Sequence, residues 1–187
     1  MELKSEPLTG WRVLLVSDLR SFTTITETFL PENVVKMLNT HLEEMAKAVR
    51  EAGGTVERFI GDAVVASFSG DTQSRAAKNA LKAARGMMLR HHQIQEDRQK
   101  NGEFSYGMGV GLASGPVLIG SIGSTDRREH AIVGRAYERA EELEAISKTG
   151  QFSRIVLSEE LKELLADVEL FNLDENAWEI VSLAEDF

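Results

Sequence analysis

The 187-residue sequence predicts an α+β fold, an α/β sandwich with a ferredoxin-like βαββαβ core and additional C-terminal strands and helices. Two observations predict it. Runs of β-branched residues and runs with helical periodicity follow one another in the order strand, helix, strand, strand, helix, strand. The breaks between them carry the glycine, proline and aspartate residues typical of turns. In such a core we expect the helices to cover one side of an antiparallel sheet and to leave the other side free for a site or a partner.

The sequence predicts one domain behind a short arm. Residues 1–10 are polar and carry Pro7 and Gly10, which predicts an N-terminal arm. Residues 11–187 contain no internal repeat, low-complexity tract or linker, so we expect them to form a single domain. Hydrophobic residues make up 42% of the chain, which is enough for a buried core.

The first half of the core is predicted as a strand, a helix and a hairpin. The apolar run at residues 13–16 stops at Ser17, as a buried strand does before a turn. From residue 31 to residue 52, apolar side chains recur every three or four positions until two glycines, which predicts an amphipathic helix. Two β-type runs at 55–60 and 63–68 flank a Gly-Asp pair and predict a tight hairpin.

The second half is predicted as a helix, a glycine-rich strand and several C-terminal elements. An alanine-rich stripe at residues 74–95 predicts a helix that packs closely on the sheet. At 104–112, bulky side chains alternate with serine and glycine, so this strand has a bare face that another group must approach closely. The remaining predicted elements are strands at 117–119, 131–133 and 154–157, helices at 135–147 and 159–165, and a closing hairpin at 168–183.

Composition and charge exclude several classes of function. The net charge is -9 and no basic cluster stands out, so we expect no nucleic-acid partner. The chain has no cysteine, which excludes disulfides, thiolate metal sites and cysteine nucleophiles and fits a cytoplasmic location. It lacks an apolar run of about 18 residues and a signal-peptide pattern, so we expect no membrane segment. His41, His91 and His92 lack metal-ligand spacing and are expected at the surface.

Two aspartates end neighbouring strands of the predicted sheet. Asp18 ends the first strand, and Asp62 lies in the turn of the hairpin. Two adjacent carboxylates form an oxygen-rich site suited to Mg²⁺ or Mn²⁺, which would bridge the phosphates of a nucleotide. The turn at residues 19–23 then enters a helix whose free amide groups suit a polyphosphate. Taken singly, each aspartate also fits a structural role, Asp18 as a helix cap and Asp62 in an Asx turn.

The segments around both aspartates resemble the signatures of the class III nucleotidyl (adenylyl/guanylyl) cyclase catalytic domain. Residues 18–23, Asp-Leu-Arg-Ser-Phe-Thr, are similar to the family's Asp-Ile-x-Gly-Phe-Thr, and residues 61–63 match its Gly-Asp-Ala turn. Residues 115–124 resemble its Gly-Pro-Val-x-x-Gly-x-x-Gly-Ser segment, and residues 133–144 align without gaps onto the helix that follows. Four motifs in order, within residues 11–157, make the chain similar to a divergent member of this family.

The resemblance implies that a nucleoside triphosphate is closed to a cyclic 3′,5′-monophosphate with release of pyrophosphate. Asp18, Asp62 and the carbonyl of Leu19 would hold two Mg²⁺ or Mn²⁺ ions. The phosphate-binding residues that the resemblance implies are Ser21, Phe22, Thr23 and Gly61. Family members work as head-to-tail dimers, so we expect a homodimer, with a hetero-partner as the alternative.

The second half of the family's site is altered in this sequence. Arg58 stands where the family places a lysine that reads the nucleotide base. Ala131 stands where the family has a second base-reading side chain, and alanine cannot form its hydrogen bond. The base preference therefore stays open, with ATP expected ahead of GTP. Glu138 replaces the asparagine that orients the ribose, and Glu142 replaces the arginine that stabilises the transition state. Arg135 and Arg139 either substitute for that arginine from one turn away or pair with the neighbouring glutamates.

Three functions therefore compete. The first is a cyclase with weak or altered activity. The second is a catalytically degenerate module that dimerises and binds metal-nucleotide without turnover. The third is another palm-like nucleotide enzyme, such as a diguanylate cyclase, although the Gly-Gly-Asp-Glu-Phe signature is absent from the sequence.

Overall fold

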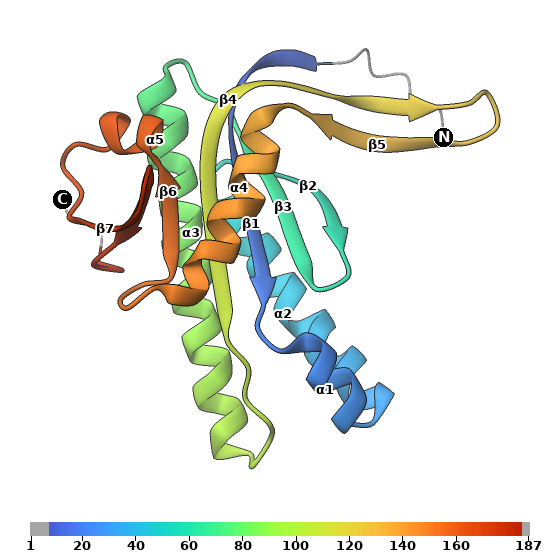
Figure 1. Cartoon of the computed structure of the whole chain (residues 1–187). Helices are drawn as coiled ribbons and strands as arrows, with labels where there is room; N and C mark the ends of the chain where they lie inside the picture. Colours follow the sequence, from blue (N-terminus) through green and yellow to red (C-terminus); the bar gives the residue numbers. More distant parts are fainter. Residues whose placement is uncertain (1–7, 185–187) are drawn as a thin grey trace.

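The computed structural model describes residues 8–184 of the chain. A mixed eight-stranded sheet runs in the order β2-β3-β1-β4-β6-β8-β7, with β5 paired to β4 beside that path (Figure 1). The strands are β1 Leu8–Leu19, β2 Thr55–Ile60, β3 Ala63–Phe68, β4 Met108–Gly123, β5 Arg128–Val133, β6 Ile155–Ser158, β7 Leu170–Asp174 and β8 Ala177–Ile180. The helices are α1 Phe22–Thr28, α2 Pro31–Glu51, α3 Gln73–Lys100, α4 Arg135–Ile146, the 3-10 turn η1 Ser147–Thr149 and α5 Glu159–Leu164. This order confirms the predicted α+β fold and its βαββαβ core.

Strand β1 lies at the centre of the sheet and is buried on both faces. Val13 and Leu15 belong to a core that includes α2 and α3, whereas Leu14 and Val16 belong to a second core built on α4. Figure 1 shows α4 crossing the sheet on the face opposite α3. The expectation of a free side of the sheet is therefore wrong, because α4 of the same chain covers it.

The glycines of β4 allow this close packing. A Cβ atom at Gly111 would collide with the carbonyl oxygen of Ala140 and the amide nitrogen of Glu144, both in α4. The bare face of this strand, which we expected to fit a partner, is thus filled by the backbone of α4. Helix and strand approach one another more closely here than any side chain at Gly111 would permit.

Several boundaries differ from the predictions. Leu8 already pairs with Ile119, so residues 8–10 belong to β1 rather than to an arm, and residues 1–7 lie outside the described part. Strand β4 is continuous through the strand predicted at 117–119, because β1 pairs with it along most of its length. Residues 103–107 form a loop instead of a strand. The apolar alternation there reflects packing on other elements, since Phe104 stacks on Phe29 with ring centroids 3.9 Å apart.

Two histidines expected at the surface are buried. His41 of α2 is 1% exposed and His91 of α3 is 4% exposed, whereas His92 is exposed as predicted. The two buried rings meet with centroids 5.8 Å apart, and His41 also contacts Tyr106. Burial lowers the pKa of His41 to about 3 and that of His91 to about 4. The direct packing of α2 on α3 explains the error, because it places these polar positions in the seam between the helices.

Among the described residues, no helix is both long and apolar enough to cross a bilayer.

Candidate metal and nucleotide site

The structure brings Asp18 and Asp62 together at the end of β1. Strand β1 pairs antiparallel with β3 through Ser17 and Val64, which places the end of β1 against the β2–β3 turn. Burial and the neighbouring Asp18 carboxylate raise the pKa of Asp62 to about 6, although backbone amides of Asp62 and Leu19 oppose the shift. The two aspartates therefore form an acidic pair whose carboxylates repel one another.

This pair has the chemistry of a divalent-cation site. Two carboxylates that repel one another gain most from a hard cation between them, and the carbonyl of Leu19 is the additional oxygen ligand implied by the resemblance. Across residues 8–184, no cluster of three or more histidine, cysteine, aspartate or glutamate side chains is placed to hold a metal. A cation at this position would thus rely on Asp18, Asp62, backbone oxygens and its own substrate or water ligands.

The turn after Asp18 leads directly into a helix N-terminus. Ser21 takes a left-handed conformation, with φ 61° and ψ 26°, at the position where the family motif has glycine. Its carbonyl accepts the first helical hydrogen bond, from the amide of Ile25 at 3.0 Å, and its side chain does not cap the helix. The first amides of α1, at Phe22 and Thr23, have no partner within the helix, as at the start of any α-helix.

The Gly61 position completes the turn that carries Asp62. Gly61 has φ 61° and is exposed, and a Cβ atom at this position would meet no other atom within 4 Å. The left-handed backbone rather than crowding therefore explains the glycine, and it leaves the turn open to a ligand.

The two expected base-reading positions, Arg58 and Ala131, lie on the separate strands β2 and β5. Arg58 follows a register shift in β2, and its guanidinium lies 5.2 Å from the centre of the Tyr137 ring. Ala131 in β5 is buried, and its methyl group offers no hydrogen bond. Glu57 and His130, which precede these residues, join the two strands through a 2.6 Å contact. The sequence does not predict this contact, because single residues on separate strands give no pairing signal.

Glu138 and Glu142 lie apart from the aspartate pair. Both line an open cavity of about 670 Å³ between α4 and the β6–α5 region, and neither Asp18 nor Asp62 lines it. Arg139 pairs with Glu142 at 2.8 Å and donates to the carbonyl of Asn176 at 2.9 Å. Arg139 is thus held by neighbouring groups, which favours the ion-pair interpretation over substitution for the missing arginine.

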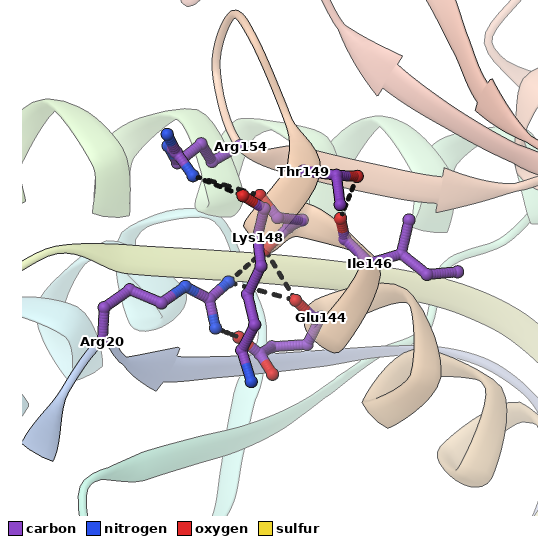
Figure 2. A network of polar contacts seen from close by, with 7 residues as sticks. Arg20, Glu144, Ile146, Lys148, Thr149 and Arg154 are labelled. Atoms are coloured by element: carbon purple, nitrogen blue, oxygen red, sulfur yellow. Dashed lines mark hydrogen bonds and ion pairs between the residues drawn. The ribbon is translucent and has the colours of Figure 1, made fainter. Parts of the chain in front are cut away.

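Arg20, two residues after Asp18, makes contacts that the sequence does not predict. Its guanidinium forms an ion pair with Glu144 and hydrogen bonds with Ser147 Oγ and, at 3.1 Å, with the Glu144 carbonyl (Figure 2). Burial raises the pKa of Glu144, Arg20 opposes this shift, and the Asp18 carboxylate adds to it. Glu144 therefore lies within electrostatic reach of the aspartate pair.

Comparisons with known proteins agree with this architecture. Residues 12–182 match the family model described as the adenylate and guanylate cyclase catalytic domain. A terminal-differentiation-specific adenylate cyclase of Dictyostelium discoideum is 35% identical over 148 residues, which are 78% of this chain and 7% of that protein. An adenylate cyclase of Anabaena cylindrica is 29% identical over 161 residues, 86% of this chain and 32% of that protein. The chain thus spans a minor part of the length of these relatives.

Solved structures share the fold over nearly the whole chain. The adenylyl cyclase CyaB from P. aeruginosa has a TM-score of 0.85 at 23% identity, covering 98% of this chain and 100% of that chain. The guanylyl cyclase Cya2 has a TM-score of 0.80 at 26% identity, covering 96% of each chain. The chain belongs to the adenylate and guanylate cyclase catalytic domain family.

Proposed function

We propose that the chain is a nucleotidyl cyclase domain that converts a nucleoside triphosphate, ATP ahead of GTP, to a cyclic 3′,5′-monophosphate and pyrophosphate. The observation that carries the proposal is the contact between Asp18 and Asp62 at the end of β1, where burial and the Asp18 carboxylate raise the pKa of Asp62 to about 6. A doubly acidic pair beside a free helix N-terminus suits a cation bound to a triphosphate.

In this mechanism the carboxylates of Asp18 and Asp62 would hold two divalent ions, Mg²⁺ or Mn²⁺. When bound, such ions lower the pKa of an attacking hydroxyl and neutralise charge on the phosphates. The amides of Phe22 and Thr23 bind the triphosphate and orient its α-phosphorus toward the ribose. The 3′-oxygen forms a bond to the α-phosphorus, the bond to the β-phosphate oxygen breaks, pyrophosphate leaves, and the hydroxyl proton passes to water.

A second chain is needed to complete the proposed site. The cavity that contains Glu138 and Glu142 does not include the aspartate pair, so one chain carries two separated half-sites. A head-to-tail homodimer would place the α4 surface of one copy over the aspartate pair of the other. Each glutamate would then face the nucleotide, and a like charge at about 5 Å costs about 3 kcal/mol at an effective dielectric near 20. We therefore expect weak turnover by the homodimer.

The alternative is a module that binds metal-nucleotide without turnover. The pairing of Glu142 with Arg139 favours it, because this ion pair engages one of the two α4 arginines that could replace the transition-state arginine. A hetero-partner that supplies asparagine and arginine would restore one complete site and would make this chain the metal-binding half.

Incubation with Mn²⁺ and each of the four nucleoside triphosphates, followed by chromatography of the products, tests the proposal. We expect a cyclic nucleotide that disappears in Asp18→Asn and persists in Asp71→Asn, a matched change at an exposed aspartate. Calorimetry with a non-cyclisable triphosphate separates the alternatives. Asp18-dependent binding without product supports the module, and the absence of both binding and product contradicts both functions.

A further inference from the structure

Arg20 connects the metal-binding segment to the far end of α4, 124 positions away in the sequence. It follows Asp18 by two residues, and its amide donates to the Gly107 carbonyl at 2.8 Å. Figure 2 shows its guanidinium and the side chain of Glu144 pointing toward each other beside β4. The side chains are 15% and 8% exposed, so solvent screens this pair less than a surface ion pair.

The path of the Arg20 side chain depends on glycine in β4. A Cβ atom at Gly109 would collide with the Arg20 guanidinium and with Ser147 Oγ. A Cβ atom at Gly107, just before the strand, would lie 3.2 Å from Cγ of Arg20, tighter than ordinary contact. The absence of side chains at Gly107 and Gly109 thus leaves a passage along the α4-facing side of β4, and the Arg20 side chain fills it.

The end of this passage is the C-terminal end of α4. Arg20 donates to the Glu144 carbonyl at 3.1 Å, and Ser147 Oγ donates to the same carbonyl at 2.6 Å. A cation at a helix C-terminus satisfies free carbonyls and complements the helix dipole. Arg20 therefore fixes the position of α4 relative to Asp18 as well as pairing with a carboxylate.

We infer that Arg20 is a positioning residue, which ties the Asp18 segment to α4 and neutralises Glu144 so that this third carboxylate does not compete for the cation. The inference rests on the proposed function, because the cation site belongs to that reaction. It gives Arg20 two separable effects. The guanidinium fork holds geometry, and the positive charge balances the negative charge near Asp18 and Asp62.

Four variants separate the two effects. Arg20→Lys keeps the charge and loses the fork, Arg20→Met loses both, Glu144→Gln leaves Arg20 charged without a carboxylate partner, and the double variant Arg20→Met/Glu144→Gln removes both charges. The matched control is Arg90→Met, since Arg90 joins α3 to Glu44 and Glu51 of α2 at 2.9 Å and 2.6 Å, away from the aspartate pair. Thermal melts identify the variants that fold.

Mn²⁺ affinity, measured by electron paramagnetic resonance on the full chain, reports the charge effect. We expect Glu144→Gln to weaken Mn²⁺ binding about tenfold, because an unpaired Arg20 repels the cation, while Arg20→Lys and the double variant bind as wild type does. Arg20→Met should bind Mn²⁺ at least as tightly as wild type. Equal weakening in all four variants would overturn the charge role, because it would show general damage to the fold.

Turnover at saturating nucleotide and Mn²⁺ reports the geometric effect. We expect kcat to fall about tenfold to a hundredfold in Arg20→Lys and in the double variant, with KM nearly unchanged and Arg90→Met equal to wild type. If kcat in both variants stays within about twofold of wild type, Arg20 has no positioning role. A wild-type chain that binds Mn²⁺ and forms no cyclic product contradicts turnover alone, and the Mn²⁺ series then decides the role of Arg20.

Discussion

Asp62 lies beside Asp18 at the end of β1, and burial together with the Asp18 carboxylate raises the pKa of Asp62 to about 6. In the metal-free protein this repulsion is a cost to stability. Because folding raises the pKa of Asp62, the protonated form of Asp62 stabilises the fold. This contribution to the free energy of unfolding is complete below the unfolded pKa of 3.8 and is lost as the pH rises through about 6. The metal-free site is thus least stable at neutral pH, where a cation would bind it best.

Asp62→Asn should therefore stabilise the chain in EDTA at neutral pH. We expect a gain of about 1 kcal/mol after allowance for solvent screening of this half-buried group, and the gain should grow between about pH 4 and pH 6. Thermal melts with EDTA and with Mn²⁺ provide the measurement. Wild type should gain stability from Mn²⁺ and the variant should not. A variant that is less stable than wild type in EDTA would contradict the repulsion, and Asp71→Asn serves as the control.

Restoring the altered half-site should raise turnover. The pair of changes Glu138→Asn and Glu142→Arg replaces two like charges with the groups that the family uses, and we expect about 10²- to 10³-fold faster cyclisation. Glu163→Arg makes the same charge change as Glu142→Arg at an exposed position of α5 that does not line this cavity, and it should have no effect. If the restored chain is no faster than wild type in a Mn²⁺-dependent assay, the α4 surface takes no part in catalysis.

The buried pair His41 and His91 should make the fold sensitive to acid. Their pKa values, lowered to about 3 and about 4, lie below the unfolded value of 6.5, so the unfolded chain binds more protons and stability falls as the pH drops below 6.5. From pH 6.5 to pH 5 each histidine costs about 2 kcal/mol. Urea unfolding at the two pH values measures the loss.

The histidine variants distinguish this effect from general acid sensitivity. His91→Gln should reduce the difference in unfolding free energy between the two pH values, while His92→Gln, at the exposed neighbouring position, should leave it unchanged. Equal pH dependence in wild type and His91→Gln would refute the assignment.

Close packing of α4 on β4 should make Gly111 intolerant of a side chain. Gly111→Ala forces Cβ against the α4 backbone, and we expect a loss of about 1–3 kcal/mol. Gly115→Ala on the same strand is the control, since its Cβ would lie 3.4 Å from the Cβ of Ala136 in ordinary contact. Chemical denaturation of both variants gives the comparison, and equal stability would show that α4 does not pack as described.

Local signals in the sequence were sufficient for most of the elements. The hairpin at residues 55–60 and 63–68 has the predicted bounds, because its two β-type runs are separated by a glycine whose left-handed backbone sets the turn. The helix from Pro31 also matches, since its apolar periodicity ends at two glycines. The adjacency of Asp18 and Asp62 followed from strand order alone.

Contacts between segments far apart in the sequence could not be predicted from local sequence patterns. The glycine alternation in β4 predicted a close neighbour, but only the tertiary structure shows that the neighbour is α4 rather than a partner. The link from Arg20 to Glu144 spans 124 positions, and neither residue carries a pattern that predicts the other. His41 was expected at the surface because periodicity describes one helix at a time and not the seam between two.

Whether Asp18 and Asp62 form the cation site is decided by Mn²⁺ titration of the wild-type chain, Asp18→Asn and Asp62→Asn, each with a non-cyclisable triphosphate. We predict that wild type binds Mn²⁺, that either substitution abolishes or greatly weakens binding, and that Asp71→Asn binds as wild type does. Binding that is absent from wild type, or that survives unchanged in both site variants, would show that these two aspartates are not the cation ligands.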